Sequence, residues 1–153
     1  MKHIGILLLS LITSLYAEEI TLYATLGMVS HHFEEDENDR RYNENHRALG
    51  AEALWDHRYT LAYLHFTNSR NKSTEITAVG YRHDLYGRFG VYGVVGYQKG
   101  YCFEGFKSVE CTEGKDNDGI AFLPMVYYRH PYFMIDFMTQ GSMVAFKLNL
   151  KLF

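Results

Sequence analysis

The sequence has few of the residues that mark many soluble folds, and each shortage narrows the choice of class. It contains only two prolines, two cysteines and one tryptophan among 153 residues. No segment beyond the first residues shows apolar positions at a 3.6-residue period over the length of a helix, which argues against a helical domain. The formal net charge of −3 excludes a broad basic surface, so we expect no nucleic-acid partner. Repeats of solenoid length and low-complexity segments are absent as well.

Residues 1–17 have the composition of a secretory signal peptide. Lys2 gives a positive start, residues 4–15 form an apolar core, and the small residue Ala17 precedes Glu18. The apolar core is shorter than the run of about 20 apolar residues that a membrane-spanning helix needs. We therefore expect export and removal of residues 1–17, which leaves residues 18–153 as a single domain.

The two cysteines, Cys102 and Cys111, are close together in a polar, charged stretch. After export they would meet an oxidising compartment, where thiols at such a spacing pair. We expect a disulfide bond that closes this short loop.

The residues that are plentiful indicate strands. Thirteen tyrosines and ten phenylalanines accompany segments in which apolar and polar residues alternate. The polar breaks between these segments are alternately long and short along most of the chain, as in small transmembrane barrels. The alternating segments are residues 20–28, 49–55, 58–66, 74–83, 88–97, 120–128, 132–138 and 144–152. The sequence therefore predicts an all-β, eight-stranded antiparallel transmembrane β-barrel, and a soluble periplasmic barrel or sandwich is the alternative.

The alternation also assigns the two faces of the strands. In residues 144–152 the apolar row would face lipid, because a charge there near mid-bilayer costs about 2–4 kcal/mol. We expect a polar plug in the middle and inner parts of the barrel, made by Lys147, Lys151, Glu52 and Arg82. Small or uncharged inward residues would leave room in its outer half: Thr25, Gly27, Val29, Ala48 and Gly50.

Several short segments, in order along the chain, resemble the lipid A palmitoyltransferase family of the Gram-negative outer membrane. They are residues 41–44 (RYNE) with Gly50, 66–72 (FTNSRNK), 78–81 (AVGY), 123–124 (LP), Pro131 and 138–139 (MT). The resemblance covers most of residues 18–153. It implies an eight-stranded outer-membrane barrel that moves an acyl chain from phospholipid to lipid A. On this basis we expect a monomer that works in the bilayer without a cofactor.

The resemblance also suggests where the chemistry lies. In that family a histidine in the first outer loop and an Asp-Ser pair in the second form the functional trio. Ser69 stands at the position of the serine, Asn68 replaces the aspartate, and His31 or His32 stands near that of the histidine. The histidine would act as general base, Ser69 as hydroxyl donor or nucleophile, and Asn68 as an oxyanion donor. Because a carboxylate at position 68 would orient the imidazole, the resemblance predicts that Asn68→Asp raises activity.

An ordinary structural reading of the same residues remains open. Asn68 and Ser69 are common turn residues, and the histidine pair could lie in a solvated loop. Pro124 falls inside a predicted strand, where it deletes a ladder hydrogen bond and opens a seam in the wall. The resemblance implies that lipid enters through such a seam. The alternative is a β-bulge through which no lipid passes.

The residues also allow functions other than acyl transfer. A lipid A deacylase would carry a His-x-Ser pair at the outer rim, and this chain offers only His65 and Thr67. The acidic run at residues 34–39 could hold divalent cations or simply be solvated, and we expect no metal site. A non-catalytic outer-membrane barrel, serving as an adhesin, scaffold or surface modifier, is the main alternative to the enzyme.

Overall fold

The computed structural model describes residues 20–33, 42–100, 118–140 and 142–152. The predicted signal peptide at residues 1–17, the acidic run at residues 34–39 and both Cys102 and Cys111 lie outside these ranges. The disulfide and the cleavage site therefore stay predictions.

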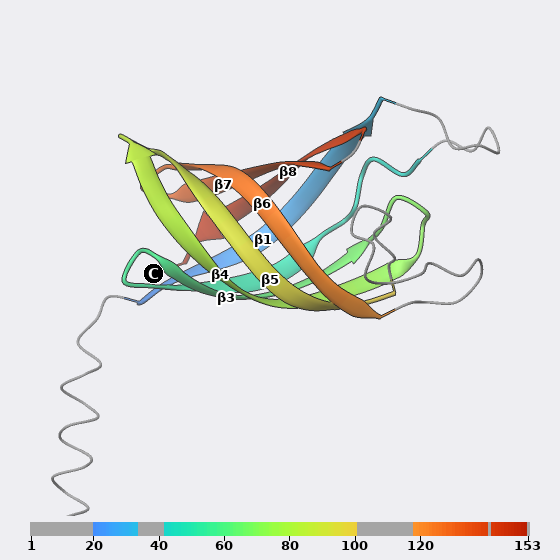
Figure 1. The fold of residues 1–153 in the computed structure, drawn as a ribbon, viewed down its shortest axis with the longest axis horizontal. Helices are drawn as coiled ribbons and strands as arrows, with labels where there is room; N and C mark the ends of the chain where they lie inside the picture. The colour runs from blue at the N-terminus through green and yellow to red at the C-terminus, as the bar shows by residue number, and fades with distance from the viewer. Residues whose placement is uncertain (1–19, 34–41, 101–117, 141, 153) are drawn as a thin grey trace, which may run out of the picture.

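The described residues form eight strands that close into an antiparallel barrel, each strand paired with its sequence neighbours and β1 with β8 (Figure 1). The predicted fold class is confirmed. The strands are β1 (Ile20–His32), β2 (Leu49–Trp55), β3 (Tyr59–Thr67), β4 (Ser73–Tyr86), β5 (Phe89–Lys99), β6 (Gly119–Arg129), β7 (Phe133–Gln140) and β8 (Met143–Lys151). No helix in the described part of the chain is long and apolar enough to cross a membrane.

The two ends of the barrel differ in their connections. We call the end with residues 33–48, 68–72, 100–118 and 141–142 the loop end, and the opposite end, with residues 56–58, 87–88 and 130–132, the turn end. The first turn is tight, as predicted. Asp56 and His57 have φ values of 50° and 55°, and the Arg58 amide donates to the Trp55 carbonyl oxygen at 3.0 Å. Two consecutive positive φ angles are typical of the type I′ turn of a hairpin.

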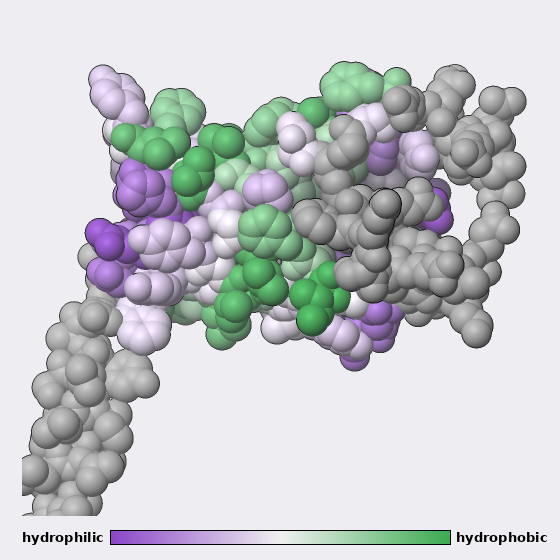
Figure 2. All heavy atoms as spheres, in the orientation of Figure 1, coloured by the Kyte–Doolittle hydropathy of each residue, from purple (hydrophilic) through white to green (hydrophobic). Residues whose placement is uncertain are grey.

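Apolar side chains cover the outer wall between the two ends, which are more polar where the view shows them (Figure 2). Leu61, Val79 and Val95 face outward from three neighbouring strands and are 48–60% exposed. Aromatic rings gather towards the turn end, where Tyr59 lies 6.2 Å from Trp55 and 5.6 Å from Tyr81, centroid to centroid. An apolar band edged by aromatic rings is the outer surface of a membrane barrel.

One irregularity in β1 changes which residues face the lumen. Pairing with β8 shifts register between Thr25 and Gly27, so Leu26 is an extra residue in the wall. Before the bulge, Thr21, Tyr23 and Thr25 are buried; after it, Met28 and Ser30 are buried. The expectation that Gly27 and Val29 face the lumen was wrong, because an extra residue exchanges the two faces of a strand with period 2. Val29 is 52% exposed on the outer wall.

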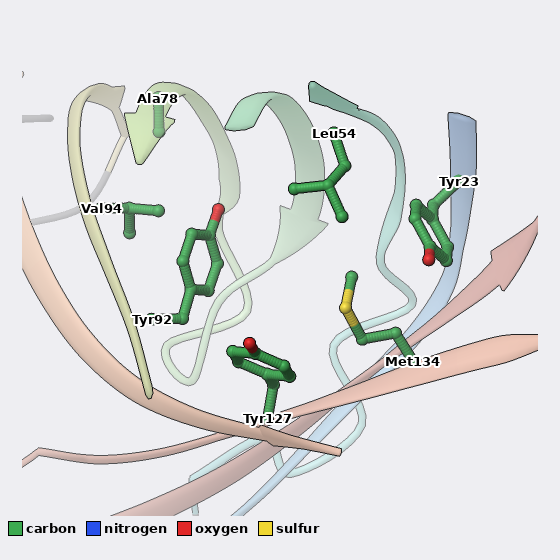
Figure 3. Close-up of a cluster of buried hydrophobic side chains, with 7 residues drawn as sticks. All are labelled: Tyr23, Leu54, Ala78, Tyr92, Val94, Tyr127 and Met134. Carbon is green, nitrogen blue, oxygen red and sulfur yellow. The ribbon is translucent and has the colours of Figure 1, made fainter. Parts of the chain in front are cut away.

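The lumen is packed with side chains in its turn-end half. Seven buried residues contributed by six of the strands form one apolar cluster, which extends from there into the middle of the lumen, and they point towards one another (Figure 3). They are Tyr23, Leu54, Ala78, Tyr92, Val94, Tyr127 and Met134. A second, smaller cluster of Met28, Ala48 and Phe66 lies nearer the loop end.

Candidate functional site

An apolar cavity occupies the loop-end half of the lumen. Its wall combines aliphatic, methionine and aromatic side chains with a few polar groups at the two ends. Residues lining it include Met28, Ala62, Leu64, Phe66, Ile76, Val94, Leu123, Met138 and Ala145, with Ser69, Asn68 and His46 towards the loops and Tyr92, Asp136 and Lys147 at the other end. Of the residues expected to leave room here, Ala48 is indeed inward and buried.

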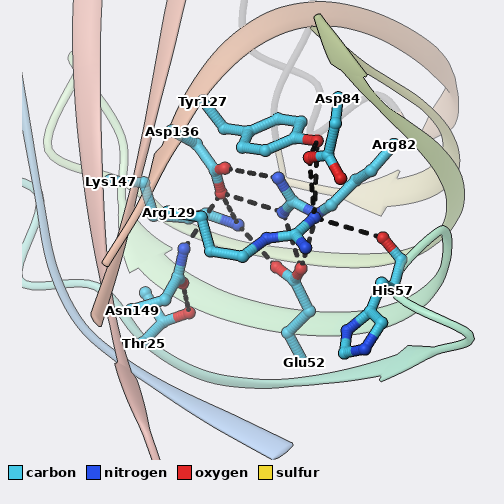
Figure 4. Close-up of polar contacts among 10 residues, drawn as sticks. All are labelled: Thr25, Glu52, His57, Arg82, Asp84, Tyr127, Arg129, Asp136, Lys147 and Asn149. Carbon is cyan, nitrogen blue, oxygen red and sulfur yellow. Dashed lines mark hydrogen bonds and ion pairs between the residues drawn. The ribbon is translucent and has the colours of Figure 1, made fainter. Parts of the chain in front are cut away.

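A buried network of ion pairs forms the floor of this cavity (Figure 4). The guanidinium of Arg82 lies between two carboxylates: Nη2 is 2.6 Å from Glu52 Oε1 and Nη1 is 2.7 Å from Asp136 Oδ1. Lys147 Nζ bridges the same carboxylates, at 3.1 Å from Glu52 Oε2 and 2.9 Å from Asp136 Oδ2. The side chains of Arg82, Glu52 and Asp136 are at most 1% exposed. Two cations therefore balance two anions inside the wall.

Neutral groups complete the network. Asn149 donates from Nδ2 to Asp136 Oδ2 at 2.9 Å and accepts the Thr25 hydroxyl on Oδ1 at 2.7 Å. Cζ of Arg82 also lies 3.5 Å from the centroid of the Tyr92 ring. The predicted plug is confirmed for Lys147, Glu52 and Arg82.

Two details of the plug differ from the expectation. Lys151 is exposed at the turn end and is not part of the plug. Asp136 was missed, although it is the one charged residue in its strand, at an inward position between Ile135 and Phe137.

Ser69 and His32 meet at the loop end of the cavity. His32, the last residue of β1, places Nε2 2.9 Å from Ser69 Oγ, which comes from the loop after β3. Its neighbour His31 points outward, where Nδ1 lies 2.9 Å from Glu44 Oε1 and the side chain is 60% exposed. Of the two predicted histidines, the structure brings His32 to Ser69 and leaves His31 on the outside.

The surroundings of His32 favour its neutral form. The ring stacks on Tyr42 with centroids 4.1 Å apart, and at this strand end, beyond the apolar band, burial lowers its pKa below the ordinary value of 6.5. The backbone N–H of His32 donates to Glu44 Oε1 at 3.3 Å, and this hydrogen bond is the main cause of the lowered pKa of Glu44. Glu44 therefore holds the backbone of His32 and the ring of His31. Among the described residues none accepts a hydrogen bond from Nδ1 of His32.

Asn68 lies beside Ser69, but its side chain is used by the loop. Oδ1 accepts the backbone N–H groups of Arg70 and Lys72 at 2.9 and 3.0 Å. Nδ2 donates to Thr74 Oγ1 at 3.0 Å and to the Gly100 carbonyl oxygen at 3.1 Å. All of these contacts hold the turn between β3 and β4 and tie it to the end of β5. None of them reaches His32.

His46 was not singled out from the sequence, yet it is 2% exposed and lines the cavity. It lies between β1 and β3 just before β2 begins. Its Nε2 is 2.7 Å from Ser30 Oγ and its Nδ1 is 2.8 Å from the Thr67 carbonyl oxygen. Burial lowers its pKa below 6.5. Apolar-polar alternation could not have predicted the position of His46, because His46 lies before the start of β2. Its partner Ser30 faces the lumen because of the bulge at Leu26.

The wall is incompletely paired beside Pro124. On one side Pro124 lies opposite Gly93 of β5; on the other, β7 pairs with β6 only from Met125 to Arg129. Within the described residues, β6 therefore has no β7 partner from Gly119 to Pro124. Leu123 and Met125, on either side of Pro124, line the cavity.

His65, proposed for a deacylase, faces outward. Its Nε2 is 2.9 Å from Ser73 Oγ in an exposed pair on the outer wall, away from the cavity lining. No group of three or more potential metal ligands gathers in the described part of the chain.

Comparisons with known proteins add little to this geometry. No family model matches the chain, and no curated protein matches it either. Among solved structures, it is similar to Ail, the attachment invasion locus protein of Yersinia pestis, solved in complex with the heparin analogue sucrose octasulfate. The sequences are 11% identical, the match covers 88% of this chain and 94% of that one, and the TM-score is 0.33. These values support no functional argument, and the comparisons do not support membership of the lipid A palmitoyltransferase family.

Proposed function

We propose that the protein is an outer-membrane lipid acyltransferase that moves an acyl chain from a phospholipid to lipid A. The observation that carries the proposal is the His32–Ser69 pair, 2.9 Å apart, at the loop end of an apolar cavity. The ion network closes the cavity at its other end, so an acyl chain would enter as far as Lys147 and Asp136 and stop there.

The outer surface supports a place in the outer membrane of a Gram-negative bacterium, reached by export through the periplasm. The apolar side chains of the wall would face lipid, and the aromatic rings of Trp55, Tyr59 and Tyr81 would lie at one interface. In small bacterial barrels the short turns are periplasmic and the longer loops extracellular. The loop end with Ser69 would then lie in the lipid A leaflet.

The gap in pairing at Pro124 supports access for lipid from the side. A chain that leaves the bilayer there would pass Leu123 and Met125, which line both the seam and the cavity. His32 would take the proton from the acceptor hydroxyl of lipid A as that oxygen attacks the acyl carbonyl carbon of the phospholipid. The bond from that carbon to the glycerol oxygen would break, and the glycerol oxygen would take the proton from His32. Ser69 would hold the imidazole in place through its hydrogen bond.

Mass spectrometry of lipid A from cells that express the protein tests this function. We expect an added acyl group with the wild type and its loss with His32→Gln or Ser69→Ala. The matched controls are His65→Gln and Ser73→Ala, because this His-Ser pair has the same 2.9 Å distance on the outer wall. Lipid A that is unchanged by the folded wild-type barrel would refute the proposal.

A second candidate is a non-catalytic outer-membrane barrel, acting as an adhesin, scaffold or surface modifier. The Asn68 side chain favours it, because that amide is fully engaged within the loops and leaves His32 without the carboxylate expected from the resemblance. In that case the His32–Ser69 contact simply fastens β1 to the loop after β3. The lipid A measurement separates the two candidates.

A further inference from the structure

A second buried His-Ser pair lies deeper in the lumen than the first. Ser30 Oγ is 2.7 Å from His46 Nε2, and His46 Nδ1 is 2.8 Å from the carbonyl oxygen of Thr67. A carbonyl oxygen only accepts, so the proton of the neutral ring must be on Nδ1. Nε2 then has a free lone pair, and the Ser30 hydroxyl donates its proton to it.

This arrangement is the one that activates a serine nucleophile. A base must accept the hydroxyl proton on one ring nitrogen while a third group fixes the ring through the other. Here the Thr67 carbonyl is the third group. The His32–Ser69 pair lacks that third member, because in the described part of the chain nothing accepts a hydrogen bond from Nδ1 of His32.

The pair is also placed where an ester carbonyl would be. Ser30 faces the lumen two residues before His32 on the same strand, which is roughly 6–7 Å along it. It is paired with Ala145 of β8, and Ala145, Met28 and His46 all line the apolar cavity. An acyl chain that fills the cavity would bring its carbonyl to this level of the shaft.

We propose that Ser30 is a nucleophile and His46 its general base in a covalent acyl-transfer step; this rests on the proposed function. Ser30 Oγ forms a bond to the ester carbonyl carbon while its proton passes to Nε2 of His46. The bond to the leaving alkoxy oxygen breaks, and that oxygen takes the proton back from His46. The acceptor hydroxyl then attacks the carbonyl carbon of the acyl-Ser30 ester while its proton passes to Nε2 of His46. The bond from that carbon to Ser30 Oγ breaks, and Oγ takes the proton back from His46, which restores free Ser30.

The competing role for His46 is structural. Its backbone N–H donates to the Met28 carbonyl oxygen at 3.0 Å and its carbonyl accepts from the Thr67 N–H at 2.8 Å, so the residue fastens β1 to β3. That role needs the same hydrogen bonds but gives Ser30 no unusual reactivity. Reactivity is therefore the quantity to measure.

The test uses a long-chain alkyl fluorophosphonate on the full exported chain folded in zwitterionic detergent. Attack by an activated serine forms a P–O bond and expels fluoride, which leaves a stable adduct. We expect one adduct, mapped to Ser30 by peptide mass spectrometry. Ser30→Ala should abolish it, His46→Gln should slow it by roughly 100-fold or more, and Ser73→Ala should leave it unchanged.

Heat-modifiable migration on gels reports whether each variant is folded, and mapping on the wild type decides the question even if a variant is not. An adduct on Ser69 alone, or none on Ser30, would overturn the proposal. Because labelling needs no lipid A, the two proposals fail separately. Labelled Ser30 with unmodified lipid A would refute the acyltransferase alone, whereas acylated lipid A without labelled Ser30 would refute the covalent step alone.

Discussion

Nδ2 of Asn68 lies 3.1 Å from the carbonyl oxygen of Gly100, across 32 residues of sequence. The contact joins the loop after β3 to the end of β5, and the same amide nitrogen also donates to Thr74 Oγ1. The Gly100 carbonyl oxygen can only accept, so this contact needs a donor at position 68. The loop that carries Ser69 therefore depends on an amide rather than a carboxylate.

We accordingly expect Asn68→Asp to destabilise the barrel by about 1–3 kcal/mol, because it sets a carboxylate oxygen against the half-buried Gly100 carbonyl. This is the opposite of the gain in activity that the resemblance predicts. Urea unfolding in detergent, with activity measured on the folded fraction, compares the two expectations. Asn71→Asp is the control, since Asn71 is an exposed residue of the same turn with φ of 60°. Higher activity with unchanged stability would show that our reading of Asn68 is wrong.

A second prediction concerns the stability of the barrel at acidic pH. The pKa values of His32 and His46 both lie below 6.5 because burial disfavours the charged ring. The unfolded chain therefore binds their protons at higher pH, so the stability they contribute is complete above about pH 6.5 and is lost as pH falls through the folded values. Glu44, with a pKa lowered from 4.5, loses its contribution only below that value. We expect the free energy of unfolding to fall from about pH 7 to pH 5, by up to about 1.4 kcal/mol per pH unit for each proton. His46→Gln should flatten this slope, and an identical slope in that variant would count against the assignment.

The ion network should be sensitive to the loss of one member. Arg82→Met leaves the buried carboxylates of Glu52 and Asp136 with Lys147 as the one cation of the described network beside them, so we expect a loss of about 3–5 kcal/mol. Arg58→Met, at an exposed turn position, should change stability little. Adding Glu52→Gln to Arg82→Met should cost less than the sum of the two single changes, because it removes the uncompensated anion. Additive costs in this double-mutant cycle would contradict the network.

A larger side chain in the wall of the cavity should shorten the acyl chain that the cavity accepts. Ala145 is 2% exposed and lines the cavity, so Ala145→Leu narrows the shaft, with an overpacking cost of about 1–3 kcal/mol. We expect lipid A from cells with this variant to carry shorter added chains, as read by mass spectrometry. Ala51→Leu, which adds the same atoms at an exposed position of β2, is the control. Unchanged chain length in a folded Ala145→Leu barrel would place the acyl chain elsewhere.

Much of the fold was predictable because a barrel strand shows its two faces in the sequence itself. Alternation located all eight strands, and inward charges such as Glu52, Arg82 and Lys147 identified the plug. The predicted strand ends were less accurate, since β4 continues to Tyr86 and β1 to His32. Backbone pairing can extend beyond the last alternating residue, and alternation carries no information on where it stops.

The candidate site was only partly predictable. Ser69 and His32 were proposed from the resemblance, whereas Ser30 and His46 were not proposed at all. Their contact depends on a register shift and on a segment outside any strand, and neither leaves a period in the sequence. The contacts of the Asn68 amide could not be predicted for a similar reason, because its partners Thr74 and Gly100 lie near the ends of two other strands.

The bulge at Leu26 decides which residues in the second half of β1 point into the lumen. Because Leu26 is the unpaired residue, its deletion would join Thr25 directly to Gly27 in the register that both already keep with β8, and Ser30 and His32 would still point inward. If Leu26 instead entered the regular ladder, inside and outside would exchange for the rest of β1, and His31 and Val29 would take the inward places of His32 and Ser30. The site therefore tolerates loss of this residue, but it does not tolerate loss of the bulge while the residue is kept.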